Sequence, residues 1–263
     1  GIPYGFVTVT FVTYLAAQGK TVEAIGTLTA MATLPCTFKW IWGPFIDRFG
    51  IPSMGRRRPW ILVAQFGMTI TILGMAFVPD PSSHLVLIGW LVFLHNIFNS
   101  LQDVSVDALA VDLLRESERG RANGFMYGSK YFGMFLGGAF LSRFVDDESL
   151  TIVFTFQVTM LAIIMLFPLF LRERAGEKLL PWTRGSSQLK LNEQLADNTL
   201  KLFSFLKRAF SLRSTLLTAL VGFLIFIAGG VLSPITKVLF IQDLGWTRVE
   251  LTDIEGGYGV FLG

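Results

Sequence analysis

The chain has 263 residues, of which 52% are hydrophobic and only 16% are charged, and its mean hydropathy is +0.57. Soluble domains carry roughly 25% charged residues, so the composition excludes an ordinary soluble domain and indicates a membrane protein. The net charge of +3 does not predict nucleic-acid binding, because the basic residues gather in loops between apolar segments. The single cysteine, Cys36, excludes a disulfide framework and a cysteine metal cluster. We expect no metal and no cofactor.

Apolar segments long enough for membrane-spanning helices recur along the chain. About 20 apolar residues in a helix cross roughly 30 Å of hydrocarbon. We predict spans at residues 1–17, 23–43, 59–78, 85–108, 122–143, 150–171 and 214–240, with an eighth beginning near residue 253. The expected fold class is therefore an all-α membrane protein. Because the chain begins and ends within apolar segments, we interpret it as a fragment of a longer protein.

The basic residues of the loops are unevenly distributed between the two sides of the membrane. Sixteen Lys and Arg residues lie in three alternate loops, residues 44–58, 112–121 and 172–213. The remaining loops, residues 18–22, 79–84, 144–149 and 241–252, hold only Lys20 and Arg248. Basic loops favour the cytoplasmic side, so we predict that the first three loops are cytoplasmic.

The long basic loop divides the chain into two membrane parts. We predict a six-helix bundle over residues 1–171, a cytoplasmic linker over residues 172–213 and the start of a second bundle over residues 214–263. In the linker, apolar residues at helical spacing predict an amphipathic helix on the membrane surface or under the bundle. These residues are Leu195, Leu202, Phe203, Leu206 and Phe210.

The turns after the first and seventh predicted spans match each other weakly. In each, an apolar helix ends at a Gly and the next helix starts from a Thr, Thr21 or Thr247. Glu250 stands three residues after Thr247, which is the spacing of a capping box. Two halves related by such a repeat are typical of secondary transporters.

A charged loop joins the second and third predicted spans. It reads Gly43-x-x-x-Asp47-Arg48-x-Gly50, followed by Gly55-Arg56-Arg57-Arg58. Gly permits close helix contact, and an Asp can pair with an Arg in one state and release it in another. We interpret this loop as a gating element that includes an Asp47–Arg48 pair. The alternative is that the three consecutive Arg residues only anchor the topology.

This loop resembles the signature of the major facilitator superfamily, G-x-x-x-D-R-x-G-R-R, expanded by "IPSM". The expanded form, together with "NSLQDVSVDALAVDLLRESERGRANG", resembles the AmpG branch of that superfamily. The resemblance implies a major-facilitator-type bundle of twelve helices, of which this chain would hold about eight. It also implies a permease of the cytoplasmic (inner) membrane that imports anhydro-muropeptides with the proton gradient as its driving force. Related acetyl-CoA transporters share part of the pattern.

Alternatives to this function remain at the level of the sequence. The cargo could instead be a sugar or an acetyl-CoA-like compound, or the protein could be a non-transporting sensor on the same fold. An enzyme is not expected, because the sequence has no zincin, acyltransferase or nucleophile-elbow pattern. The expected partners are the lipid bilayer and a small polar solute, with no nucleic acid, and we expect a monomer.

Polar residues follow one face of the fourth predicted span. Asn96, Asn99, Ser100, Asp103 and Asp107 fall within an arc of about 100° on a helix. Insertion of a charge at the bilayer centre costs roughly 2.5–3.5 kcal/mol, so this stripe should face a cavity or charged partners. We expect the two acids to carry protons during transport.

Two lysines are candidate partners of this polar stripe. Lys39 lies at a depth of roughly 24 Å from the outer end of its span and Asp103 at roughly 27 Å, so their levels match. Lys130 shares a helix face with Tyr127 in the fifth span. We expect Lys39, Asn96, Asn99, Tyr127 and Lys130 to bind the cargo. The alternative is a set of static ion pairs that lock the bundle.

Two further ionisable residues have simpler interpretations. Lys237 ends the seventh predicted span, so we expect its side chain to reach the outer surface. His95 lies beside the polar stripe but points 100° away from Asn96, and we interpret it as a hydrogen-bonded core residue.

Overall fold

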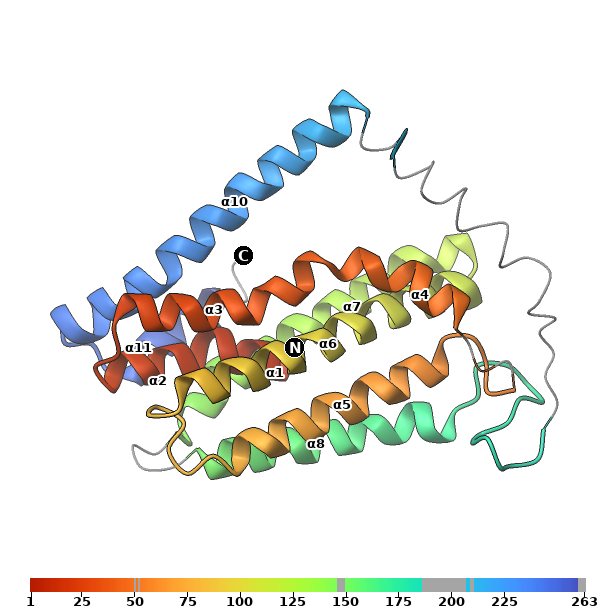
Figure 1. Cartoon of the computed structure of the whole chain (residues 1–263), viewed down its shortest axis with the longest axis horizontal. Helices are drawn as coiled ribbons and strands as arrows, with labels where there is room; N and C mark the ends of the chain where they lie inside the picture. The colour runs from red at the N-terminus through yellow and green to blue at the C-terminus, as the bar shows by residue number, and fades with distance from the viewer. Residues whose placement is uncertain (50, 52, 146–149, 186–206, 209–210, 260–263) are drawn as a thin grey trace.

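The computed structural model describes residues 1–49, 51, 53–145, 150–185, 207–208 and 211–259, which form a bundle of long helices (Figure 1). The helices of the first membrane part are α1 (Ile2–Gly5), η1 (Phe6–Phe11), α2 (Val12–Ala17), α3 (Val22–Thr37), η2 (Lys39–Ile41), α4 (Trp42–Arg48), α5 (Arg58–Ala76), α6 (Leu85–Leu113), α7 (Glu116–Phe135), η3 (Leu136–Phe140) and α8 (Thr151–Phe170). Those of the second are α10 (Arg213–Val238), η4 (Leu239–Asp243), α11 (Arg248–Thr252) and η5 (Asp253–Tyr258).

Within the described residues, four helices are long and apolar enough to cross a membrane: Arg58–Ala76, Leu85–Leu113, Thr151–Phe170 and Arg213–Asp243. The helix Ile2–Ala17 is apolar but shorter. In the first membrane part, α6 packs against both α3 and α5, and α5 also packs against α8 (Figure 1). One apolar core joins these helices through buried side chains such as Phe11, Leu15, Ile25, Ile88 and Val153. The helical class predicted from hydropathy is confirmed for the described residues.

The helix boundaries differ from the predicted spans mainly at the basic loops. The predicted loop 112–121 is mostly helical, because α6 runs to Leu113 and α7 begins at Glu116. Hydropathy marks where a helix leaves the hydrocarbon, and a polar helix continues past that point. The eighth span begins at Arg248 rather than near residue 253, directly after its cap. The predicted amphipathic helix falls largely on residues 186–206 and 209–210, outside the described residues.

The second predicted span is broken rather than continuous. Helix α3 ends at Thr37, a short 3₁₀ turn covers Lys39–Ile41, and α4 continues to Arg48. Pro44 lies in the first turn of α4, and a proline has no N–H to bond the carbonyl four residues earlier. That carbonyl belongs to Trp40, so the interruption falls on the turn that contains Lys39. Residues 44–48, predicted to be loop, are helical.

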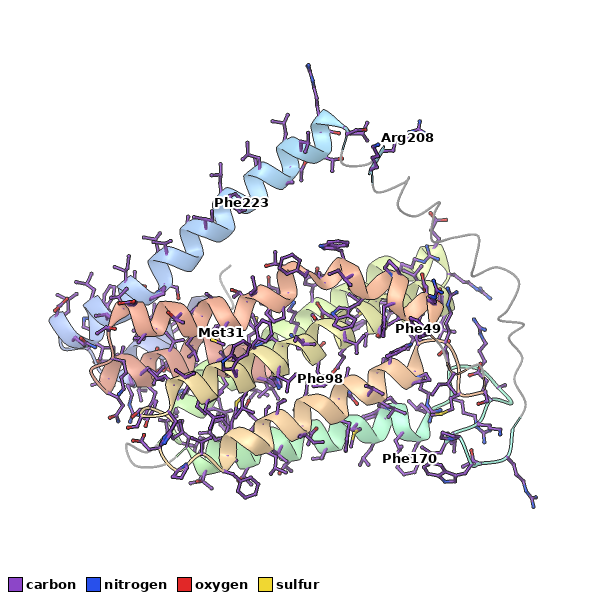
Figure 2. All side chains as sticks on the ribbon, in the orientation of Figure 1. Met31, Phe49, Phe98, Phe170, Arg208 and Phe223 are labelled. Atoms are coloured by element: carbon purple, nitrogen blue, oxygen red, sulfur yellow. The ribbon has the colours of Figure 1, made fainter. Side chains whose placement is uncertain are left out.

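The two ends of the bundle differ in charge. The segments that follow α4, α6 and α8 all lie at one end, which we call the cytoplasmic end (Figure 1). The α2–α3 and α5–α6 turns lie at the other, which we call the outer end. Helix α10 packs on α2 and α3, and the N-terminal part of α10 diverges from the bundle (Figure 1). Figure 2 shows Phe223 on this diverging part of α10.

The turns after α2 and η4 are built alike. Gly19 and Gly245 have φ of 70° and 71°, which is the left-handed region that favours glycine. The Thr21 side chain then accepts the Ala24 N–H, and Thr247 forms a capping box with Glu250. The predicted repeat of a Gly turn and a Thr cap is therefore confirmed.

Candidate functional site

Lys39 and Asp103 face each other inside the first membrane part. The Lys39 ammonium lies 3.5 Å from the Asp103 carboxylate, and their side chains are 50% and 42% exposed. The predicted pairing is therefore present. The exposure matters because two charges at this depth cannot face lipid cheaply. We infer that the pair borders a water-accessible space rather than the dry core.

Asp107 lies one helical turn beyond Asp103, where two open pockets meet. The first, with a volume of about 310 Å³, is lined by Lys39, Arg57, Val104, Asp107, Ala108, Val111 and Asp112. The second, with a volume of about 340 Å³, is lined by Asp107, Ala110, Val111, Arg119, Gly120, Asn123, Met126 and Tyr127. Asp107 thus stands between one pocket that lies beside Lys39 and Arg57 and another that lies between α6 and α7.

The other residues of the predicted polar stripe differ in how deeply they are buried. Asn96 is buried, and its amide donates to the Val92 carbonyl of its own helix at 3.0 Å. Ser100 is buried and accepts the Trp42 indole N–H at 2.8 Å. Asn96 therefore lines neither of the two pockets, and its predicted contact with the cargo stays a prediction. Asn99 is only partly buried.

His95 and the α7 residues also have clear positions. His95 is buried and its Nδ1 lies 3.1 Å from the Thr71 hydroxyl, so the interpretation as a hydrogen-bonded core residue is confirmed. On α7, the Lys130 ammonium lies 6.0 Å from the centre of the Tyr127 ring, within cation–π range. Both of these α7 side chains are exposed, and Tyr127 lines the second pocket.

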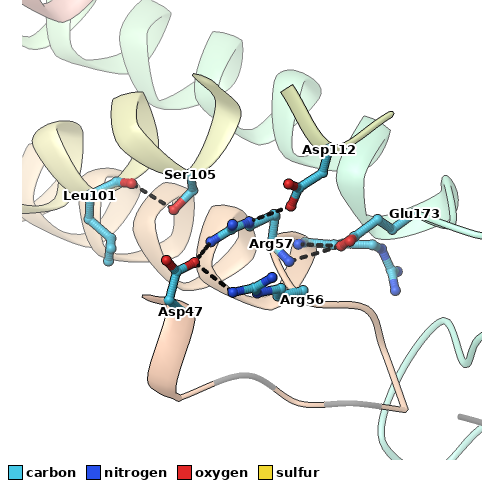
Figure 3. Close-up of polar contacts among 8 residues, drawn as sticks. Asp47, Arg56, Arg57, Leu101, Ser105, Asp112 and Glu173 are labelled. Carbon is cyan, nitrogen blue, oxygen red and sulfur yellow. Dashed lines mark hydrogen bonds and ion pairs between the residues drawn. The ribbon is translucent and has the colours of Figure 1, made fainter. Parts of the chain in front are cut away.

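A second cluster of charges lies at the cytoplasmic end (Figure 3). The Arg57 guanidinium donates to Asp47 at the end of α4 and, at 2.8 Å, to Asp112 at the end of α6. Arg56 donates to Asp47 at 3.0 Å. The Arg57 side chain is only 7% exposed, so this arginine is an internal link that joins α4, the start of α5 and α6.

Arg58 holds the end of α8 instead. Its guanidinium donates to four carbonyls: Pro168 and Leu169 in the last turn of α8, and Lys178 and Leu179 beyond it. A positive charge at a helix C-terminus is stabilised by the helix dipole. Glu173 completes the arrangement by accepting the Arg57 and Arg58 N–H groups at the start of α5, at 2.9 and 3.1 Å (Figure 3). The guanidinium groups of Arg56 and Arg57 therefore share Asp47, whereas that of Arg58 binds carbonyls.

Two details of the predicted gating loop need correction, the Asp47–Arg48 pair and the close helix contact at Gly43. Asp47 pairs with Arg56 and Arg57, whereas the Arg48 guanidinium lies 5.7 Å from the Phe49 ring centre. Residues adjacent on a helix point about 100° apart, which explains why Arg48 does not share the site of Asp47. A Cβ on Gly43 would meet nothing within 4 Å, so close helix contact does not explain this glycine. At Gly55 φ is +101°, and a Cβ would lie 2.5 Å from Glu173.

Sequence reasoning missed Asp112 and Glu173. Both are acids at the cytoplasmic ends of spans, where basic residues predominate. An acid in a basic loop is a usable signal, because it has arginines to pair with. Their positions on the segments after the fourth and sixth spans gave no indication that both would meet the start of α5.

The chain belongs to the major facilitator superfamily, whose family model matches residues 1–263. With four helices of spanning length, it is a multi-pass membrane protein, and its bacterial permease relatives agree with the predicted cytoplasmic (inner) membrane. Members of this family are transporters rather than enzymes, as predicted.

Several curated relatives carry the name of the branch that the loop resembles. A protein of Rickettsia conorii, provisionally named transporter AmpG 4, is 25% identical over 99% of this chain and 61% of its own length. A protein of Rickettsia typhi, provisionally named transporter AmpG 3, is 25% identical over 100% of the chain and 62% of its own length. The anhydromuropeptide permease of Escherichia coli is 27% identical over 56% of the chain and 30% of its own length. The chain thus spans about three fifths of the length of the Rickettsia relatives.

Proposed function

We propose that the chain forms the first half and part of the second half of a proton-coupled importer of a small anionic solute. The observation that carries this proposal is the Lys39–Asp103 pair, which is half exposed at a depth where a membrane protein excludes unneeded charge. The similarity to an anhydromuropeptide permease supports anhydro-muropeptides as the cargo class. We propose that the protein acts as a monomer.

Coupling follows from competition for one lysine. With Asp103 ionised, Lys39 has its counterion and has little attraction for another anion. A proton on Asp103 removes that counterion, and the ammonium becomes available to a carboxylate of the cargo. Binding of a proton and binding of an anion therefore favour each other. Each pH unit of gradient then corresponds to about 1.4 kcal/mol, or roughly a tenfold accumulation per proton carried.

The remaining contacts suit a cargo with sugar and carboxylate groups. Lys130 supplies a second cation on α7, Asn99 an amide, and the exposed ring of Tyr127 a face for stacking. Asp107 borders both open pockets, and we propose that it accepts the proton on the cytoplasmic side. Aromatic rings pack against the apolar face of a sugar, while amides and cations recognise its polar groups.

The cytoplasmic cluster has the position of a latch. Asp47 forms ion pairs with Arg56 and Arg57, which directly precede α5, and Arg57 also pairs with Asp112 of α6. We propose that this latch keeps α4, α5 and α6 together as one body while the halves of the transporter move. Ion pairs that can re-form are suited to a two-state element of this kind.

Uptake in proteoliposomes tests the proposal. The complete transporter, with an inward pH gradient and labelled anhydro-muropeptide, should accumulate the compound, and Asp103→Asn should abolish accumulation but retain exchange of cargo across the membrane. Asp107→Asn is the matched control, one turn along the same helix, and should be milder. Wild-type accumulation in Asp103→Asn would exclude this residue as the coupling site. No uptake by the wild-type protein would favour another cargo or a sensor.

A further inference from the structure

Polar contacts join the two membrane parts at the outer end. The Arg143 guanidinium, just after η3, contacts both carboxylate oxygens of Asp253 in η5, at 2.7 and 2.9 Å. The Thr252 hydroxyl donates to the Ser142 hydroxyl at 2.7 Å. These contacts join the fifth and eighth spans across the boundary between the two parts.

The backbones come together at the same place. A Cβ on Gly256 would lie 2.9 Å from the Ala139 nitrogen and 3.1 Å from the Gly138 Cα. Such separations leave no room for a side chain between η3 and η5. The helices η3 and η5 are therefore in direct contact at the outer end, whereas α10 diverges from the bundle toward the cytoplasmic end (Figure 1).

A buried ion pair stands directly behind this contact. The Lys237 ammonium lies 2.7 Å from the Glu255 carboxylate, and their side chains are 3% and 28% exposed. Lys237 also contacts the Ser233 hydroxyl at 2.9 Å. The prediction that Lys237 reaches the outer surface is wrong, because its side chain turns inward to this partner.

Both residues of the pair lie at one depth in the membrane. Lys237 precedes the end of η4 at Asp243 by six residues, and Glu255 follows the start of α11 at Arg248 by seven. At 1.5 Å per residue these positions are roughly 9 and 10 Å below the outer end. A charge pair there is expensive to hold unless both partners are present, so the pair fixes η5 to α10.

We propose that Glu255, held by Lys237, positions the outer contact, and that the charge on Glu255 decides whether the contact stays shut. Glu255 directly precedes Gly256, which packs against Gly138. It lies two residues after Asp253, which pairs with Arg143. A proton on Glu255 leaves Lys237 buried without a counterion. The packing of η5 on α10 then loosens, and the segment that touches η3 moves with it. This inference rests on the proposed transport function.

Several other charged groups lie near Glu255 at the outer end. Asp253 is paired with Arg143, and the Arg248 guanidinium lies 5.9 Å from the Tyr14 ring centre. In the part of the chain that the structure describes, the neighbouring outer segments also carry Lys20, Glu23, Asp243 and Glu250, while Asp146, Asp147 and Glu148 of the outer loop 144–149 lie outside that part. Among the described residues, Lys237 is the cation that contacts Glu255.

The native cysteine reports on opening at the outer end. Cys36 lies roughly 21 Å along α3 from its outer start at Val22, and it is partly buried. In the complete transporter with Cys36 as its single cysteine, a membrane-impermeant maleimide applied outside intact cells should label it slowly. Glu255→Gln should raise the labelling rate several-fold, and Glu255→Asp should restore the slow rate. Glu23→Gln, an exposed acid at the same end, is the control and should leave the rate unchanged.

Two further measurements separate positioning from a general loss of structure. Acid slows the maleimide reaction itself, because it lowers the fraction of thiolate, so rates are divided by that of a fully exposed cysteine at each pH. The corrected rate of the wild type should rise on external acidification and that of Glu255→Gln should not, which a merely structural role would not predict. Asp253→Asn, which breaks the contact between the two parts without touching Lys237, should raise labelling in the same way. Unchanged labelling in Asp253→Asn, or an acid response that persists in Glu255→Gln, would overturn the proposal. Labelling requires neither cargo nor gradient, so its outcome is separate from that of the uptake assay.

Discussion

Lys39 and Asp103 form an ion pair at 3.5 Å, and the lysine lies on the turn at which the second span is broken. Helix α3 ends at Thr37, and α4 restarts at Trp42 under the constraint of Pro44. Lys39 therefore projects from an irregular turn instead of a helix interior. An ion pair on such a turn can be broken by a small change of backbone angle, which is the property that a coupling site needs.

Lys39→Gln should impair cargo binding more than turnover. The ammonium is the proposed anchor for a cargo carboxylate, so its loss should raise KM by about tenfold, with a smaller change in maximal rate. A tenfold change corresponds to a loss of about 1.4 kcal/mol of binding free energy. Uptake kinetics in proteoliposomes measure both. Lys39→Arg, which retains the charge, is the control. An unchanged KM for Lys39→Gln would show that the cargo binds elsewhere.

The three basic loops, which contain Arg56, Arg119 and Arg184, should be accessible from the cytoplasm alone. Single cysteines at Arg56, Arg119 and Arg184, introduced after removal of Cys36, should react with an impermeant reagent in inverted vesicles and not in intact cells. The positive-inside count predicts this, because sixteen of eighteen loop Lys and Arg residues lie on that side. A cysteine at the exposed Ser83 should show the opposite pattern. External labelling at any of the first three would reverse the topology.

The sequence predicted the bundle well because hydropathy, charge asymmetry and turn residues are local properties. The Gly19–Thr21 and Gly245–Thr247 turns were recognised from a few residues each. The level of Lys39 against Asp103 could also be predicted, since depth along a helix is a matter of counting.

Partners that depend on packing between distant helices could not be predicted in the same way. Asp47 was assigned to its neighbour Arg48, but Arg56 and Arg57 return to it through the loop. Glu255 could not be matched to Lys237, because the rotation of α10 against η5 depends on side chains from several helices. Asn96 lies on the same face of α6 as Asp103, but its amide is hydrogen-bonded to the Val92 carbonyl within that helix.

Asp47→Asn should slow transport more than it weakens cargo binding. The substitution removes the charge shared by Arg56 and Arg57 and leaves the helix shape unchanged. Because the substitution leaves Lys39 and Asp103 themselves unchanged, the maximal rate should fall several-fold with little change in KM. Arg48→Gln is the matched control on the next residue, since Arg48 contacts Phe49 instead. Normal turnover with weak binding in Asp47→Asn would contradict the latch.

Arg58→Lys should destabilise the protein, whereas Arg56→Lys should not. The Arg58 guanidinium is buried and donates to carbonyls of α8 and of the segment after it. A lysine keeps the charge but cannot reach four carbonyls from one planar group. Leaving buried polar groups unpaired costs about 1–3 kcal/mol each, so the melting temperature in detergent should fall clearly. Arg56 is more exposed and makes one ion pair. Equal melting temperatures for the two variants would show that the α8 cap is not needed.

The last prediction concerns the segment after α8, where burial raises the pKa of the Glu177 carboxyl above its usual value of 4.5. The nearby Glu173 carboxylate raises this pKa further, while the Arg174 N–H and the Arg174 and Arg58 charges lower it without reversing the shift. A raised pKa means that the folded segment favours the neutral acid. Its stabilising effect is therefore complete below the usual pKa and is lost as the pH rises through the folded value.

Glu177→Gln should then strengthen this segment at neutral pH and remove its pH dependence. Hydrogen exchange of residues 172–183, corrected for the intrinsic effect of pH, measures the change. Glu173→Gln is an informative comparison, because this carboxylate accepts the Arg57 and Arg58 N–H groups at the start of α5, where a negative charge is favourable. Protection should rise in Glu177→Gln and fall in Glu173→Gln. Weaker protection in Glu177→Gln at neutral pH would mean that the ionised carboxylate holds the segment, and that its bond to the Arg174 N–H outweighs the cost of burial.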